Sequence, residues 1–221
     1  MREDILPRIG QLAYSNEATL RNTYEIATKL CTDKVEGAFV ECGVAQGAQV
    51  AMMLMACQEL GDKRPVYLFD SFEGIPLCGP RDDAQPGIGA PKHDVNLPES
   101  ERLKTSGISV GSVQAVWKNL SDMKLPVNQC QFVRGWFQNT VPDWKAEDKI
   151  ALLRLDGDLY ESTKVCLEHL YPKLVVGGYI IIDDYGLPGC KAAVKEYFDG
   201  TTPAYNAVLD TCKVIWWRKE D

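Results

Sequence analysis

The segment IALLRLDGDLYEST, residues 150–163, indicates the fold class of this chain. It begins with an apolar run typical of a buried strand, passes through an acidic turn, and continues into a helical pattern. A second run, GYIIIDDY at residues 178–185, is rich in β-branched residues and also ends in acids. Two buried strands, each leading through a turn into a helix, predict a parallel α/β sheet covered by helices.

The same alternation extends along most of the chain. Further strands are predicted at three short apolar runs, residues 38–42, 65–70 and 130–134. Helices are predicted at residues 18–31, 48–60, 162–174 and 191–198, and from about Ser112, a suitable N-cap. Two strand-like runs, residues 205–210 and 213–219, predict a terminal hairpin joined by a few residues. Right-handed crossovers make this a doubly wound, Rossmann-like sheet that is mostly parallel, with an antiparallel C-terminal hairpin strand.

We expect one domain over residues 1–221, with an N-terminal helical segment at residues 1–34. Residues 73–111 interrupt the alternation with five prolines and six glycines. A long irregular stretch inside a compact domain is usually a lid or a binding loop. We therefore expect residues 73–111 to shape the pocket of an acceptor molecule.

Composition excludes several classes of function. A net charge of −7, with scattered Lys and Arg, disfavours a nucleic-acid partner, which needs a basic footprint. No apolar run is long enough to span a membrane, and the acids and proline of residues 1–10 argue against a signal peptide. We expect a cytoplasmic protein whose partner is a small molecule.

Eight cysteines invite an interpretation as disulfides or a zinc site. Their spacing argues against both, since no C-x-x-C occurs and only His93 and His169 are available as co-ligands. Most of the cysteines lie in apolar stretches, where the side chain behaves as a small hydrophobe. We expect reduced, structural thiols.

Acids follow the predicted strands repeatedly. Glu41, Asp70, Asp156, Asp183 and Asp184 each come at the end of an apolar run. A carboxylate is costly to desolvate in such a place unless it has a task, and ligands of open α/β sheets gather at the carboxyl ends of the strands. Five acids at these ends therefore predict a site.

The turn after the first strand reads ECGVAQG, residues 41–47. Gly43 allows a close approach of a ligand to the backbone and Gly47 eases the start of the helix, although a plain strand–turn–helix connection would need the same glycines. The dinucleotide fingerprint G-x-G-x-x-G is absent, and Glu41 suits the amino group of a cationic amino-acid ligand. Asp70 suits ribose hydroxyls, or alternatively caps its own turn. Together these residues predict an adenosine-type ligand.

The aspartates at the ends of the two strands we began with predict a metal site. Asp156 and the pair Asp183–Asp184 would lie close together if their strands are neighbours, and three such carboxylates repel unless a cation neutralises them. Oxygen ligands alone point to Mg²⁺. Alternatively, the Asp-Asp pair caps a helix that begins near Pro188. Asp158, two residues beyond Asp156, is a general base for a substrate hydroxyl, a fourth ligand, or a turn residue.

Four segments resemble the macrocin O-methyltransferase family, whose members methylate sugar hydroxyls of macrolides and of novobiocin. They are DSFEGIP (70–76), RGWFQNTVP (134–142), LLRLDGDLYESTKVCLEHLYPKL (152–174) and GGYIIIDDYGLPGCKAAV (177–194). The resemblance implies a class I methyltransferase with a seven-stranded sheet, S-adenosylmethionine as cofactor, and Mg²⁺ held by Asp156, Asp183 and Asp184. It also implies that Asp158 is the base.

The resemblance assigns further residues to the cofactor. Its cofactor loop corresponds to residues 41–47 and its ribose acid to Asp70, followed by Ser71 and Phe72. Ser112, Gly135 and Trp136 match segments that lie near the adenine. A homodimer, with the N-terminal helix as a candidate contact, is also implied.

We therefore expect an enzyme that transfers a methyl group in line from S-adenosylmethionine to a hydroxyl of a sugar or glycosylated metabolite. A catechol or phenol acceptor, and a non-catalytic protein that binds S-adenosylmethionine, are the alternatives. A nicotinamide dehydrogenase is disfavoured by the missing glycine fingerprint. The loop VAQGA (44–48) and residues 75–110 depart from the family's pattern, which leaves the acceptor open.

Overall fold

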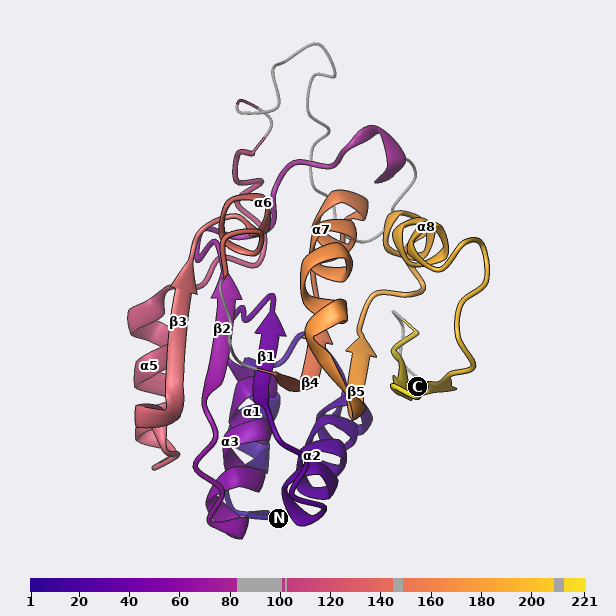
Figure 1. Ribbon diagram of the computed structural model, residues 1–221. Coiled ribbons are helices and arrows are strands. Elements are labelled where there is room, and N and C mark those ends of the chain that lie inside the picture. Colours follow the sequence, from indigo (N-terminus) through magenta and orange to yellow (C-terminus); the bar gives the residue numbers. More distant parts are fainter. Residues whose placement is uncertain (83–100, 102, 145–148, 209–212) are drawn as a thin grey trace.

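The computed structural model describes residues 1–82, 101, 103–144, 149–208 and 213–221. Within them a seven-stranded sheet has the order β3-β2-β1-β4-β5-β7-β6, and β7 alone runs antiparallel to both of its neighbours (Figure 1). The strands are β1 (Ala38–Cys42), β2 (Val66–Asp70), β3 (Cys130–Arg134), β4 (Ile150–Leu155), β5 (Leu174–Ile182), β6 (Asn206–Ala207) and β7 (Ile215–Arg218). The predicted fold class is confirmed, with strand order reversing between β1 and β4.

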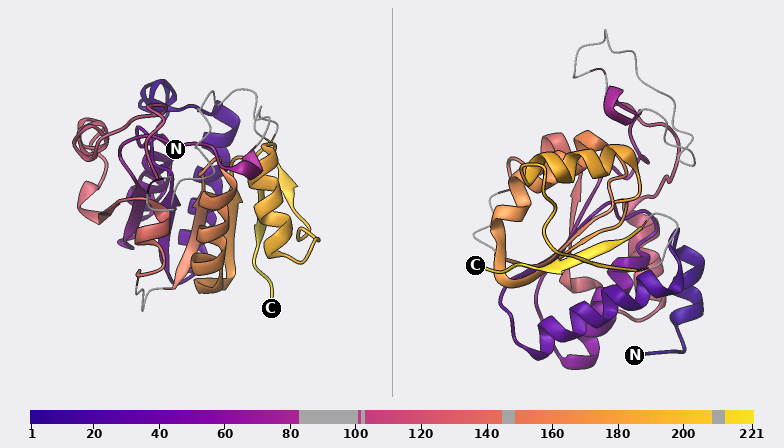
Figure 2. Two further views of the ribbon diagram at one scale, coloured as in Figure 1. Left: turned by 90° about the horizontal axis from the view of Figure 1, so that it is seen from above. Right: turned by 90° about the vertical axis from the view of Figure 1, so that its right-hand side faces the viewer.

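Helices cover both faces of the sheet, as the two views in Figure 2 show. One apolar core joins the first face to α1 (Leu6–Leu12), α2 (Glu17–Thr32), α3 (Ala48–Leu60) and α5 (Val113–Asp122). The other core joins the opposite face to α6 (Phe137–Thr140), α7 (Tyr160–Leu170) and α8 (Pro188–Tyr197). Short 3-10 turns are η1 (Pro80–Asp82), η2 (Val127–Gln129) and η3 (Tyr171–Lys173).

The central strands are buried on both faces, which explains their continuous apolar sequence. Along β4 and β5 neighbouring residues alternate between the two cores: Leu152 and Ile181 belong to the first, whereas Leu153 and Ile180 belong to the second. Burial of both faces removes the alternation of polar and apolar residues that marks a one-sided sheet.

Most predicted elements are confirmed, with shifts at their ends. The prediction for α3 matches at both ends, and the Ser112 hydroxyl caps α5 by accepting a hydrogen bond from the Ala115 amide at 3.1 Å. Helix α7 starts two residues earlier than predicted and passes into the η3 turn at Tyr171. Helix α8 begins at Pro188, which is favoured in a first helical turn because its missing N–H has no partner there.

Two other predictions need correction. The terminal hairpin forms, but its first strand is only Asn206–Ala207, paired to Ile215 and Trp216, while residues 209–212 lie outside the described part. The N-terminal helical segment predicted at residues 1–34 contains two helices, whereas a helix was located only at residues 18–31; the additional helix, α1, packs on α3 and buries Leu6 and Ile9. None of the described helices has the length and apolar character that crossing a membrane requires.

Candidate active site

A cavity opens at the carboxyl ends of the central strands, where the predicted site residues were expected to meet. Nine of these residues line it: Glu41, Gly43, Asp70, Ser71, Trp136, Asp156, Asp158, Asp183 and Asp184. They come from the ends of β1, β2, β4 and β5 and from the turn before α6. The convergence follows from the parallel sheet, whose strands all end at the same edge.

The four other predicted residues are outside the lining of this cavity. Gly47 precedes α3, Ser112 caps α5, and Gly135 follows β3, where its amide donates to the Asp70 carbonyl at 2.9 Å. Phe72 is buried against Phe132, with ring centroids 6.0 Å apart. The predicted contacts of Ser112 and Gly135 with the adenine, and of Gly47 and Phe72 with other parts of the cofactor, stay predictions.

The turn after β1 depends on its glycines. Gly43 has φ +94°, and a β-carbon there would lie 1.8 Å from the Asp156 carbonyl oxygen, because the ends of β1 and β4 are in close contact. Gly47 has φ +87° and directly precedes α3, and a β-carbon there would lie 2.9 Å from Val116. Both positions therefore need glycine, and the close approach at Gly43 is between two strand ends.

Asp70 holds two turns together. One carboxylate oxygen accepts hydrogen bonds from the Val44 and Ala45 amides at 2.7 and 3.1 Å, and the other accepts from the Phe72 amide at 2.6 Å. A carboxylate has about four acceptor positions. Asp70 therefore caps its own turn, as the alternative interpretation had it, and keeps limited capacity for a ligand.

Arg154 stands at the centre of the acids, although its side chain is fully buried. Its guanidinium donates to Glu41 at 3.0 Å, to Asp156 at 2.7 Å and to Asp183 at short range. Burial disfavours the cation, but Asp183, Asp156 and Glu41 outweigh this effect and raise the pKa of Arg154. Arg154 is thus a fixed positive charge that neutralises part of the acidic site.

Asp156, Asp158 and Asp184, called the acid cluster below, each place a carboxylate oxygen within 4.8 Å of the others. The Asp158 amide donates to Asp184 at 3.0 Å, and Asp158 has a left-handed backbone with φ +56°. The Leu187 side chain, at the N-cap position of α8, provides no cap, and the Leu187 amide donates to the Asp184 backbone carbonyl at 2.8 Å. The structure brings Asp158 into this group, whereas the predicted ligand Asp183 contacts Arg154 instead.

The acids raise one another's pKa. Burial, and then the charges of Asp156 and Asp183, raise the pKa of Asp158 to about 8. Burial and the neighbouring aspartates, Asp158 first, also raise the pKa of Asp184. Burial raises the pKa of Glu41 to about 8 despite Arg154. One arginine therefore does not compensate this many carboxylates, and the set of oxygen donors fits a hard divalent cation.

The N-terminal segment also lines the cavity, which the sequence did not indicate. The wall includes Leu12, Ala13, Tyr14 and Ser15. The side-chain amide of Gln49 donates a hydrogen bond to the Ser15 hydroxyl at 3.0 Å. The side-chain oxygen of Gln49 and one carboxylate oxygen of Glu41 are buried, and neither has a hydrogen-bond partner in the described part of the chain. These two acceptors leave capacity for donors of a ligand.

The described ends of the irregular segment pair with each other beside the cavity. Ile75 donates to the Ile108 carbonyl at 3.0 Å and Leu77 to the Lys104 carbonyl at 3.1 Å. Gly74, Ile75, Pro76 and Ser109 line the cavity, and the role of this segment in binding an acceptor stays a prediction. Residues 83–100, with His93, lie outside the described part.

Asp82 connects this segment to the helix that follows the acid cluster. One of its carboxylate oxygens accepts from the Tyr160 amide at 2.8 Å, at the start of α7, and the other from the Gly79 amide at 2.9 Å. Leu159, at the N-cap position of α7, provides no side-chain cap. Asp82 supplies that cap from a distant part of the chain.

Known proteins resemble this chain over most of its length. Residues 6–219 match the family described as Macrocin-O-methyltransferase (TylF). A tetracenomycin C rhamnosyl 4'-O-methyltransferase of Streptomyces olivaceus is 35% identical over 193 residues, which are 87% of this chain and 65% of that protein. Demethyldecarbamoylnovobiocin O-methyltransferase of Streptomyces niveus is 37% identical over 181 residues, covering 80% of this chain and 64% of that protein. The chain therefore spans somewhat less than two thirds of the length of these curated relatives.

A solved structure agrees with these matches. The O-methyltransferase NovP superposes with a TM-score of 0.70 at 33% identity, covering 92% of this chain and 80% of the other.

Proposed function

This chain belongs to the macrocin-O-methyltransferase family, and we propose that it transfers a methyl group from S-adenosylmethionine to a hydroxyl of a sugar or glycosylated small molecule. The main support is that the acid cluster and the turn after β1 line the same cavity. One of the curated relatives acts, by its name, on a rhamnosyl-bearing tetracenomycin, and the other on demethyldecarbamoylnovobiocin. The activity needs the cofactor and the acceptor hydroxyl side by side, and a single cavity suits that requirement.

The cofactor would lie along the ends of β1 and β2. Glu41 supports this placement, because one of its oxygens lines the buried wall without a hydrogen-bond partner and suits the amino group of S-adenosylmethionine. Asp70 would accept one ribose hydroxyl with its remaining capacity, while Ser71 and Trp136 line the same side. Gly43 keeps the turn close to the strand ends.

Mg²⁺ is proposed to be held by Asp156, Asp183 and Asp184. A divalent cation held by these aspartates would lower the pKa of an acceptor hydroxyl. Asp156 and Asp184 are supported by their closeness in the acid cluster. Asp183 enters through the family's motif, and its contact with Arg154 must be shared or exchanged when the cation binds.

Asp158 is proposed to accept the proton of the acceptor hydroxyl on a carboxylate oxygen. It lies within 4.8 Å of Asp156 and Asp184, so a hydroxyl oriented by those two residues is within its reach. The chain's own contribution is thus orientation: Asp158 faces the hydroxyl, and Ile75, Pro76 and Trp136 limit access of water.

The experiment is a methyl-transfer assay with labelled S-adenosylmethionine and a panel of glycosides and catechols, with and without chelator. We expect transfer to a glycoside hydroxyl, loss of transfer in chelator, and recovery with Mg²⁺. Transfer only to catechols would mean that the acceptor is a catechol and not a sugar or glycosylated molecule. Calorimetry that detects S-adenosylhomocysteine binding without transfer to any acceptor would favour a non-catalytic binding protein, and binding of NAD alone would contradict the proposal.

A further inference from the structure

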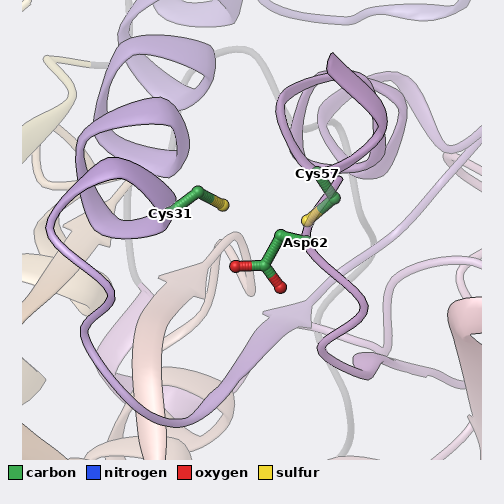
Figure 3. Close-up of side chains that lie close together, drawn as sticks. All are labelled: Cys31, Cys57 and Asp62. Atoms are coloured by element: carbon green, nitrogen blue, oxygen red, sulfur yellow. The ribbon is translucent and has the colours of Figure 1, made fainter. Parts of the chain in front are cut away.

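We propose that Cys31, Cys57 and Asp62 form a binding site for a soft divalent cation such as Zn²⁺, remote from the candidate active site. We call these three residues the thiol cluster (Figure 3). The inference does not depend on the proposed methyl transfer, because none of the three residues lines the active-site cavity. It revises the expectation that all the cysteines are only structural thiols.

Topology explains why these residues meet. Helices α2 and α3 precede β1 and β2, which are parallel neighbours, so both helices end at the same edge of the sheet. Cys31 lies in the last turn of α2 and Cys57 in the last turn of α3, and Asp62 follows the C-terminal end of α3. In Figure 3 the two thiols extend from their helices toward the space beside the Asp62 carboxylate.

The donor atoms have the chemistry and spacing of a metal site. The two sulfur atoms and a carboxylate oxygen lie within 4.8 Å of one another. In a tetrahedral zinc site with bonds of about 2.0–2.3 Å, ligand atoms are roughly 3.5–4 Å apart, so small side-chain rotations suffice. Cys57 is fully buried and Cys31 is 8% exposed, which excludes competing solvent from the sulfur side.

The charges around the thiol cluster balance when a cation is bound. Each thiol would release its proton to solvent as its sulfur binds the metal, which gives two thiolates beside the Asp62 carboxylate. Arg64 donates to Asp62 from its guanidinium at 2.7 Å and from its amide at 2.8 Å. The negative charges of the two thiolates and the carboxylate then balance the positive charges of a divalent cation and Arg64, so the group as a whole is neutral.

Two further features favour a cation here. The C-terminal ends of α2 and α3 both carry partial negative charge, and they converge on this position. The Asp62 side chain is 18% exposed, which gives the metal a route from solvent and leaves a position for a water ligand. Its oxygens can accept a metal bond besides the contacts with Arg64, since each has two lone pairs.

A second buried thiol pair provides the matched control. Cys42 and Cys166 contact each other through their side chains, but neither belongs to a group of metal donors among the described residues. Cys166 is 1% exposed, so replacing it tests the same loss of a buried sulfur without touching the thiol cluster.

The test is a titration of the full chain with Co²⁺ in a non-thiol reductant, read by the thiolate-to-cobalt charge-transfer absorption. We expect saturation at one cobalt per chain, displacement by Zn²⁺, and no displacement by excess Mg²⁺. Cys31→Ser and Cys57→Ser should lose the band, whereas Cys166→Ser and Asp184→Asn should keep it. Absence of the band in the wild type, or its persistence in both cysteine variants, would overturn the proposal.

X-ray absorption at the zinc edge keeps the test decisive if a cysteine variant does not fold. The wild-type chain loaded with one Zn²⁺ should show two sulfur ligands. A spectrum with oxygen and nitrogen ligands alone would place the zinc elsewhere and contradict the proposal.

Discussion

The acid cluster and the thiol cluster lie at opposite edges of the same sheet, and each gathers three donors within 4.8 Å beside an arginine. Their chemistry differs. The acid cluster has only oxygen donors and faces a cavity, and burial together with the crowded carboxylates raises the pKa of Asp158 and Asp184. In the thiol cluster, the hydrogen bond with Cys31 and burial raise the pKa of Cys57, which keeps that thiol neutral.

This difference in donor atoms indicates which of the two clusters depends on a bound cation. Crowded carboxylates can all ionise only when a cation neutralises them, so the acid cluster is a place where a metal changes chemistry. In the thiol cluster Arg64 already pairs with Asp62, so a cation there would add stability to α2 and α3. The predictions below separate the two clusters.

The largest effect is expected from Asp184→Asn. Loss of this carboxylate should lower the methyl-transfer rate by more than roughly a thousandfold, or about 4 kcal/mol, because the hydroxyl is no longer activated. S-adenosylhomocysteine affinity by calorimetry should stay near that of the wild type. Cys57→Ser is the matched change in the thiol cluster and should keep the methyl-transfer activity. Equal losses of activity in the two variants would contradict the assignment of different roles to the two clusters.

Replacing the two arginines compares the clusters through stability. Arg154→Met should lower the free energy of unfolding by about 4 kcal/mol, since it removes the counter-ion of the buried Glu41 and Asp183 and of the half-buried Asp156. Arg64→Met should cost about 2 kcal/mol, because its partner Asp62 is nearer to solvent. Urea unfolding measures both, and a larger loss for Arg64→Met would contradict the account.

Two glycines provide a matched pair near the clusters. Gly43→Ala should destabilise the chain by about 3 kcal/mol, through its left-handed backbone and the overlap with the Asp156 carbonyl. Gly61→Ala, beside Asp62, should cost only about 1 kcal/mol, since φ is +69° but no atom lies within 4 Å of the new β-carbon. Thermal unfolding distinguishes them, and similar shifts would mean that the strand ends can separate easily.

Asp158→Asn sharpens the roles inside the acid cluster. As the proposed base, it should lower turnover by roughly a hundredfold, while the affinity for Mn²⁺, a paramagnetic substitute for Mg²⁺, changes little. Asp183→Asn should weaken Mn²⁺ binding. If Asp158→Asn loses Mn²⁺ and Asp183→Asn keeps it, Asp158 is a ligand and the two residues exchange roles.

The sequence predicted the sheet and the acids because both follow from local patterns. The strands ending at Cys42, Asp70 and Leu155 are apolar runs, and parallel strands bring their ends together whatever the loops do. Arg154 was overlooked, although a charged residue inside a buried apolar strand was a visible signal.

Other features depend on contacts between distant residues. Ser15 reaches Gln49 and Asp82 caps α7 through hydrogen bonds that no local motif encodes. The spacing of the cysteines argued against a metal site, because a motif such as C-x-x-C detects only ligands that are close in sequence. Cys31 and Cys57 meet instead because their helices end at the same edge of the sheet.

The most direct test of the central claim is a titration with Mn²⁺ followed by electron paramagnetic resonance, in the presence of S-adenosylhomocysteine. The account predicts one tightly bound Mn²⁺ per chain in the wild type and in Cys57→Ser, and loss of that binding in Asp184→Asn. Equal binding in Asp184→Asn and the wild type, or no binding in either, would contradict the assignment of the acid cluster as the site of the catalytic cation.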